Sequence, residues 1–372
     1  MTTGNRTLPM IERLGRSDVI ALGSEWDALV SASPVSTPFL SWPWIGAWLE
    51  TLGLEADLEV VVARDPIDGR LIGIAPFFVE TRRRLGVGFR SLRLIGSGPA
   101  APDHLDMPIA APDPAPVAAA LWQAVNRSRR WDFVDLDGVA SGGWLAGILL
   151  RRRSDRAIAE QIPAPFLPLE GGWDAVQRRF GSNHRQNLGR YRRKLDRDAA
   201  EPLTERIVVH PTDLEATMDR LIAMHQTIRT SHGDPGAFAT PALEDFQRAA
   251  ARRMLAAGRL RLWRLDVGST TIAAIECFRF GDTVSFYTTG FDPSWAAYGP
   301  GRAVMARAIR GAVDEGAAEF DFLRGDESYK RSWGTATRHD LRIRRPAIAK
   351  GRLLWSASRI VRGIRGGRRP RT

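Results

Sequence analysis

Titratable residues are concentrated just after one short apolar segment near the C-terminal end of the chain. DFLRGDESYKRSWG, residues 321–334, begins as a strand-like run and then places Tyr329 and Lys330 among three other charged residues. Asp321 alternates with two phenylalanines, so its side chain is expected on the opposite face of the strand. Such a cluster either forms a solvated loop or lines a site that transfers protons and stabilises charge. The first alternative has support, because most lysines in proteins are solvated.

A glycine-rich turn precedes this cluster by about 30 residues. In YTTGFDPSWAAYGPGRAVMARAIRGAVDEG, residues 287–316, Tyr298, Gly299 and Gly301 lead into a predicted helix with Arg302 in its first turn. Glycines let backbone amides approach a ligand, and a helix N-terminus favours an anion such as a pyrophosphate. The alternative is a tight turn into a packed helix, because short glycine motifs are weak signals.

One acidic residue lies inside an apolar strand pattern. Glu276 is in the middle of TTIAAIECFRF, where a carboxyl group is costly unless it faces a cleft or a cation. It is either a catalytic base or a salt-bridged structural residue. Cys277, the single cysteine, is predicted to be a buried, inert thiol and is typical of a reducing compartment.

The elements that would position these residues recur in the two halves of the chain. In the first half, residues 58–65 and 70–80 are predicted to form a hairpin, a helix is predicted to start near Pro116, and residues 131–138 are predicted to form a further strand. The same order is predicted from residues 260–266, 270–280, a helix over 302–315, and 318–326. We interpret this as a duplicated α/β unit.

Two helices are predicted between the halves. Residues 181–198 are strongly basic and include Arg185, which either contacts an anionic acceptor or, as we favour, belongs to a solvated face. Residues 214–238 carry apolar side chains at helical spacing and end at a Gly-Asp-Pro-Gly sequence. His225 lies on that apolar face, where a histidine is more often a core residue than a ligand.

Composition and charge restrict the possible classes of protein. At 372 residues the chain predicts two domains, and its apolar runs are too short to span a membrane. We expect no signal peptide and a cytoplasmic location.

The net charge of +11 equals the number of basic residues after Asp340, where no acidic residue occurs, so the excess positive charge of the chain lies in a basic tail. The six histidines lack metal-ligand spacing, so no metal is expected.

Several motifs in order resemble a known family. The chain resembles the BioF2-like, cellulose-biosynthesis (CelD/BcsL) acetyltransferases of the GNAT superfamily in residues 290–316 and 320–334. Four further stretches fit the same family: TPFLSWPWIGAWLETLG (37–53), DHLD (103–106), SNHRQNLGRYRRKL (182–195) and MHQTIRTSHGDPGAF (224–238). That group is similar to the FemABX peptidyltransferases. The resemblance implies an α/β (α+β) fold of two tandem GNAT-like domains, each a mixed sheet flanked by helices.

The resemblance also implies roles for individual residues. Acyl transfer from acetyl-CoA or another acyl-CoA requires a base, which would be Glu276, and an acid for the leaving thiolate, which would be Tyr329. Lys330 would neutralise developing negative charge, and Asp321 would join the catalytic group. Tyr298, Gly299, Gly301 and Arg302 would bind the cofactor. The acceptor side would be lined by His104, Asp106, Arg185, His225 and Trp333.

Three functional hypotheses remain at this point. The first is N- or O-acetylation of a saccharide or amine acceptor in exopolysaccharide or cell-envelope synthesis. The second is aminoacyl transfer from a charged tRNA, with the basic helix and tail on its phosphates. The third is a regulatory protein whose arginine-rich tail, with the apolar stripe that begins at Leu353, binds an anionic membrane at the inner face of the plasma membrane or a cyclic dinucleotide.

The expected domain organisation follows from these patterns. Residues 1–165 are predicted to form an N-terminal GNAT-like domain, residues 166–200 a basic linker helix, and residues 201–345 a C-terminal domain with the donor site. Residues 346–372 are predicted to form a basic, amphipathic tail.

Overall fold

The computed structural model describes residues 8–35, 37–84, 86–150 and 157–354, and divides the chain into two compact units. The first unit comprises Met1–Val35, Glu55–Gln161 and Leu341–Thr372, and the second comprises Ser36–Leu54 and Ile162–Asp340. This division places residues 341–345 in the first unit and residues 162–165 in the second, where the sequence predicts the reverse. The 36–54 segment belongs to the second unit, and the expected linker helix is part of that unit as well.

The first unit is an α/β unit with the strand order β1-β2-β3-β4-β5-β12. Its elements are β1 (Met10–Leu14), α1 (Arg16–Ala21), α2 (Gly23–Ala32), β2 (Asp57–Arg64), β3 (Leu71–Arg84), β4 (Val87–Leu94), α4 (Pro114–Ser128), β5 (Phe133–Ala140) and α5 (Trp144–Leu150). Neighbouring strands from β1 to β4 are antiparallel, and β4 pairs with β5 in parallel. The unit boundary falls within β6 (Ile158–Pro168) and β12 (Ala336–Pro346), which contribute to both units.

The second unit repeats this plan with the strand order β6-β11-β10-β9-β8-β7. Its strands are β7 (Leu203–Ile207), β8 (Leu260–Val267), β9 (Thr270–Phe280), β10 (Thr283–Phe291) and β11 (Glu319–Asp321). Its helices are η1 (Pro38–Leu40), α3 (Trp42–Glu50), α6 (Gly172–Arg179), α7 (Ser182–Asp198), α8 (Pro211–Ser231), α9 (Pro241–Ala256), η2 (Pro293–Tyr298), α10 (Pro300–Asp314) and α11 (Ser328–Arg331).

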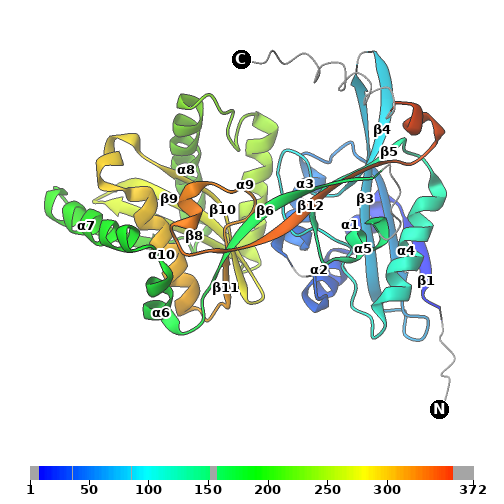
Figure 1. Ribbon diagram of the computed structural model, residues 1–372, viewed down its shortest axis with the longest axis horizontal. Helices are drawn as coiled ribbons and strands as arrows, with labels where there is room; N and C mark the ends of the chain where they lie inside the picture. Colours follow the sequence, from blue (N-terminus) through cyan, green and yellow to red (C-terminus); the bar gives the residue numbers. More distant parts are fainter. Residues whose placement is uncertain (1–7, 36, 85, 151–156, 355–372) are drawn as a thin grey trace, which may run out of the picture. The chain divides into compact units, whose positions relative to one another are not determined.

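Helices cover both faces of the second unit's sheet, with α6 and α10 on one face and α8, α9 and α3 on the other (Figure 1). The continuous apolar run of β9 follows from this arrangement, because a strand covered on both faces buries side chains of both alternating sets, here from Thr271 to Phe278. Ile275 and Cys277 pack with the α10 side chains, whereas Phe278 packs in edge and tilted contacts with Trp44 and Tyr287.

Helix α10 shows how local sequence sets the ends of an element that positions the site. It begins at Pro300, where a missing N–H costs nothing, and the chain leaves it through Gly316 at a φ of +74°. Its apolar residues Val304, Met305, Ala308 and Ile309 recur at helical spacing and are buried in the core.

Candidate active site

Strands β10 and β11 are paired over a short distance only. Thr283–Ser285 of β10 pair in parallel with Glu319–Asp321, and β10 then continues to Phe291. On its other side, the register of β10 against β9 shifts between Phe286 and Thr288, so Tyr287 is the extra residue of a β-bulge. Strand β10 therefore separates from β11 close to a β-bulge. Bulges are often found beside active sites, because they turn backbone groups out of the hydrogen-bonded ladder.

The N-terminus of α10 follows this strand. Gly299 is its N-cap, with a φ of +60°, and a β-carbon built there would lie 3.0 Å from the ring of Tyr191. Glycine is therefore required both by the left-handed conformation and by the close ring. Arg302, in the first turn, makes a cation–π contact with the same ring at 5.8 Å and has no carboxylate partner among the described residues.

Helix α7 places further positive charge beside this helix N-terminus. Its 17 residues include six arginines and lysines. Arg190 lies over the ring of Tyr191 at 5.3 Å, and the Lys194 ammonium lies 4.5 Å from the centre of the Tyr298 ring. Tyr191 carries no sequence signal for this role, because it is separated from Gly299 by more than 100 residues and matches no motif on its own.

Glu276 is the buried acid of the site. Its side chain is fully buried, and neither carboxylate oxygen has a hydrogen-bond partner in the described part of the chain. It lies directly opposite Thr288, next to the bulge. Burial raises the pKa of Glu276 to about 8, so the group holds its proton at neutral pH. The alternative role in a structural salt bridge is not observed, because none is formed within the described residues.

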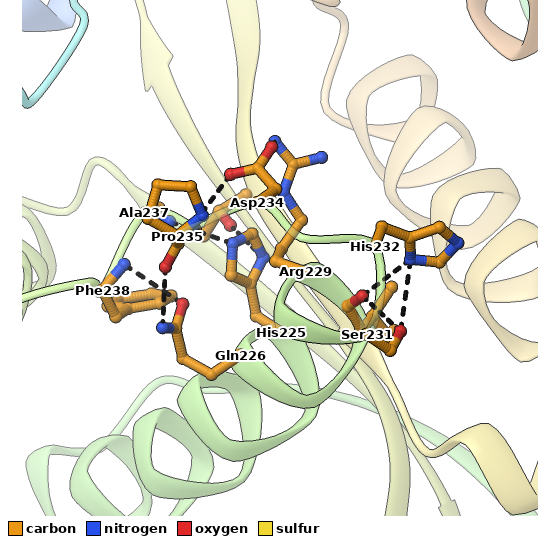
Figure 2. Close-up of polar contacts among 12 residues, drawn as sticks. His225, Gln226, Arg229, Ser231, His232, Asp234, Pro235, Ala237 and Phe238 are labelled. Atoms are coloured by element: carbon orange, nitrogen blue, oxygen red, sulfur yellow. Dashed lines mark hydrogen bonds and ion pairs between the residues drawn. The ribbon is translucent and has the colours of Figure 1, made fainter.

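His225 has a different environment from the acceptor-facing one that was expected. Its Nδ1 donates to the Thr289 carbonyl at 2.9 Å. Its Nε2 accepts from the Ala237 N–H at 3.2 Å (Figure 2). Both ring nitrogens are thus used to join α8, β10 and the loop after α8. Burial, opposed by the bond to Thr289, lowers the pKa of His225, which keeps the imidazole neutral. We therefore assign His225 a structural role.

Asp321 is also committed to structure. One carboxylate oxygen accepts the Leu323 N–H at 2.9 Å, and the other accepts from Arg338 at 2.7 Å. The first bond stabilises Leu323, a non-glycine residue at a φ of +55°. Asp321 therefore shapes the exit from β11, and its expected catalytic role stays a prediction.

Lys330 is buried rather than exposed. Its ammonium donates to the carbonyls of Arg324 at 2.6 Å and Leu323 at 3.3 Å, and it pairs with Glu327 at 3.0 Å. Its side chain is 4% exposed. These contacts fold the chain after β11 around one internal cation, so Lys330 positions the loop that carries its neighbour Tyr329.

Tyr329 and Trp333 lie on opposite sides of this loop. Tyr329 is 42% exposed, while the surrounding protein atoms and the Glu327 carboxylate raise the pKa of its phenol, which therefore stays protonated. Trp333 is 1% exposed and packs against Phe180 at 5.1 Å. The expected substrate contact of Trp333 is corrected, because its ring belongs to the core.

The remaining acceptor candidates do not join this cluster. Arg185 donates to the carbonyls of Gln177 and Arg178 at the end of α6, which fits a cation at a helix C-terminus. In the first unit, Asp106 is fully buried and accepts the Trp144 and Leu145 N–H groups at the start of α5. Burial, opposed by these bonds, raises its pKa to about 6. Asp106 is thus a helix cap, and His104 lies beside it at a φ of +58°.

Comparisons with known proteins agree with this arrangement. Residues 182–331 match the family model of the acetyltransferase (GNAT) domain. FemX has a similar structure, with a TM-score of 0.60 and 9% identity over 90% of this chain and 96% of that one. A conserved protein of unknown function from Bacteroides thetaiotaomicron has a TM-score of 0.55 and 12% identity over 91% of this chain and 100% of its own.

A third similar structure is the C-terminal domain of a putative lysylphosphatidylglycerol synthetase from Agrobacterium fabrum. Its TM-score is 0.53, with 11% identity over 92% of this chain and 96% of that one. No curated protein matches the chain. At these identities the structures establish the fold, and the family model establishes the domain over the residues it matches.

The chain is therefore an α/β protein of two units that repeat one plan, and its fold is similar to that of FemX over nearly the whole length of both chains. The matched residues 182–331 include the β10–β11 separation and the α10 N-terminus, so the candidate site lies in the part of the chain that is similar to the acetyltransferase (GNAT) domain.

Three other expectations concern metals, membranes and the tail. Within residues 8–354, where described, no group of three or more histidine, cysteine, aspartate or glutamate side chains is arranged to hold a metal ion. None of the helices in those ranges is long and apolar enough to cross a bilayer. The expected amphipathic tail lies largely outside the described residues, which end at 354.

Proposed function

We propose that the protein transfers an acyl group from an acyl-CoA, acetyl-CoA in the simplest case, to an amine or hydroxyl of a cell-envelope saccharide precursor. The observation that carries the donor assignment is the N-terminus of α10, where Gly299 and Arg302 meet the Tyr191 ring of the basic helix α7. A helix N-terminus with an arginine that lacks a carboxylate partner in the described chain suits a pyrophosphate.

The proposed reaction uses the neighbouring groups in turn. The nucleophilic nitrogen or oxygen attacks the thioester carbonyl carbon and loses its proton to the Glu276 carboxylate. The backbone at the Tyr287 bulge polarises the carbonyl oxygen, as the C–S bond breaks. The departing CoA thiolate takes a proton from the Tyr329 phenol. With a pKa of about 8, Glu276 is a base matched to weakly alkaline conditions.

The choice of acceptor rests on the sequence resemblance to polysaccharide-associated acetyltransferases. A saccharide offers both hydroxyl and amino nucleophiles, and the proposed chemistry serves either. The chemical identity of the acceptor is tested by incubating the purified protein with labelled acetyl-CoA and cell-envelope precursors, and identifying by mass spectrometry which molecule gains an acetyl group.

The donor site is tested by calorimetry with acetyl-CoA on matched charge-reversal variants. Arg302→Glu should weaken binding by about tenfold or more, because it replaces a phosphate-pairing cation with a repelling charge. Arg310→Glu is the control, since Arg310 lies on the same helix two turns away and is 58% exposed. Absence of acetyl-CoA binding by the folded wild type, or equal loss in both variants, would refute the donor assignment.

Aminoacyl transfer from a charged tRNA is the second candidate function. Helix α7 favours it, because Arg190 and Arg193 are exposed and neither has an ion-pair partner within the described ranges. A basic helix next to the donor site suits a nucleic-acid backbone, whose binding weakens steeply with salt. Electrophoretic mobility shifts with tRNA at increasing salt would support this candidate if Arg190→Glu and Arg193→Glu abolished the shift and acetyl-CoA did not bind.

A further inference from the structure

One buried imidazole beside the donor site has no assigned role. His184, the third residue of α7, is 8% exposed, and its Nε2 has no hydrogen-bond partner among the described residues. Its ring packs edge-on against Trp333 at 4.3 Å and against Phe180 at 6.0 Å. Leaving a buried polar group without a partner is costly, so an unpaired polar atom in a native protein calls for an explanation.

The neighbourhood of His184 connects three elements that converge on the donor site. Burial and the nearby Arg302 guanidinium lower the pKa of His184 to about 4, so the imidazole is neutral at neutral pH. Arg302 belongs to the first turn of α10. The Gly181 N–H bonds to the Ser332 carbonyl at 3.1 Å, which joins the start of α7 to the loop of Trp333. His184 thus lies where α7, the α10 first turn and the segment after α11 meet.

We propose that His184 is a binding residue of the donor site, whose Nε2–H donates a hydrogen bond to a phosphate oxygen of the acyl carrier held by Arg302. The inference rests on the proposed function, because it takes the carrier to be a phosphorylated thioester donor such as an acyl-CoA. A phosphate at this position would satisfy the unpaired Nε2 and the unpaired Arg302 together. A neutral imidazole adds a directed donor without adding a second repelling cation beside Arg302.

The experiment compares three variants by calorimetry with CoA and with inorganic pyrophosphate. His184→Phe keeps a ring against Trp333 and removes both nitrogens, and it should weaken binding of both ligands by about tenfold. It should also raise the unfolding temperature, because an unpaired polar group leaves the core. His184→Gln, which retains a donor near the Nε2 position, should recover affinity to within about threefold of the wild type. His232→Gln, at the exposed end of α8, is the control and should match the wild type.

A second measurement follows the wild-type protein itself and does not depend on how the variants fold. In nuclear magnetic resonance spectra of isotope-labelled histidine, the His184 signal, identified by its loss in His184→Phe, should shift on addition of CoA or pyrophosphate, and the His232 signal should not. If CoA binds while the His184 signal and the affinity of His184→Phe stay unchanged, this inference is overturned and the donor assignment stands. If the wild type binds no CoA, both are overturned.

Discussion

At the scale of single residues, the candidate site combines one buried acid, the base that we propose, with several residues whose polar atoms are hydrogen-bonded. Neither carboxylate oxygen of Glu276 has a hydrogen-bond partner among the described residues. By contrast, Asp321 bonds to the Leu323 N–H and the Arg338 guanidinium, and both ring nitrogens of His225 bond to backbone groups. Residue type and position in a motif make all three residues candidates for the site. Their hydrogen bonds distinguish Glu276, the base that we propose, from the two residues that hold neighbouring segments together. Lys330 shows the same point, because its ammonium is bound by the carbonyls of its own loop.

Glu276→Gln tests the base through both rate and stability. The variant should lower turnover by about a hundredfold or more and abolish the rise in rate toward a pH of about 8. In the folded protein the group keeps its proton up to about pH 8, whereas its ordinary pKa is 4.5. The unfolded chain therefore loses the proton first, and wild-type stability should fall as pH rises from 4.5 to 8, by up to about 1.4 kcal/mol per pH unit.

Thermal unfolding of both proteins across this pH range provides the measurement. The Glu276→Gln protein should lack this part of the pH dependence, so that its stability relative to the wild type increases steadily toward pH 8. Parallel stability curves for the two proteins would contradict the burial of a protonated Glu276, and an unchanged pH–rate profile would remove its role as the base.

At the scale of elements, the proposed donor site is formed by the N-terminus of α10 and by helix α7, which packs against it. Gly299 needs both its positive φ and the space next to Tyr191. Gly299→Ala should therefore cost about 1–2 kcal/mol in stability from its backbone conformation and also displace the Tyr191 ring, with a loss of acetyl-CoA affinity of about fivefold or more.

A matched glycine at the other end of the same helix separates these two effects. Gly316 has a φ of +74°, but a β-carbon there would meet no atom within 4 Å. Gly316→Ala should thus lose stability to a similar extent and bind acetyl-CoA as the wild type does, as measured by chemical denaturation and calorimetry. Equal losses of affinity in both variants would indicate that the Gly299–Tyr191 contact does not shape the site.

Element types were largely predictable from the sequence, while the contacts that form the site were not. The β8–β9 hairpin, α10 and β11 follow from periodicity and turn residues, which are local signals. The contact of Tyr191 with Gly299 and that of His184 with Trp333 join residues that are more than 100 positions apart. No local pattern encodes such a contact, so the basic residues of α7 were interpreted as a solvated face.

At the scale of the whole molecule, the two units repeat one plan but differ where the donor would bind. In the first unit β4 and β5 pair only at Ser91–Leu92 with Phe133–Val134, as β10 and β11 pair briefly in the second. There, however, Leu105 forms a bridge to Val139 of β5 and Ile109 a bridge to Gly73 of β3. The first unit's own chain occupies the space beside its strands.

One acyl-CoA should therefore bind per chain. Calorimetric titration of the full-length protein with acetyl-CoA is expected to give a stoichiometry of one, and Arg302→Glu is expected to weaken that single phase. A second binding phase that survives in the Arg302→Glu protein would contradict the assignment of the donor to the second unit alone.

The interleaving of the chain between the units bears on how the protein is made. Because residues 36–54 pack in the second unit, Trp44 and Phe39 must wait for β9, some 230 residues later, before their rings are covered. The first unit likewise takes its last strand from β12, and Lys350 then bonds to the Gly88 carbonyl. Neither unit is a contiguous stretch, so a nascent chain completes both only when nearly all of it has been synthesised. A shortened form meant to remove the basic tail must therefore keep the contact of Lys350 with Gly88.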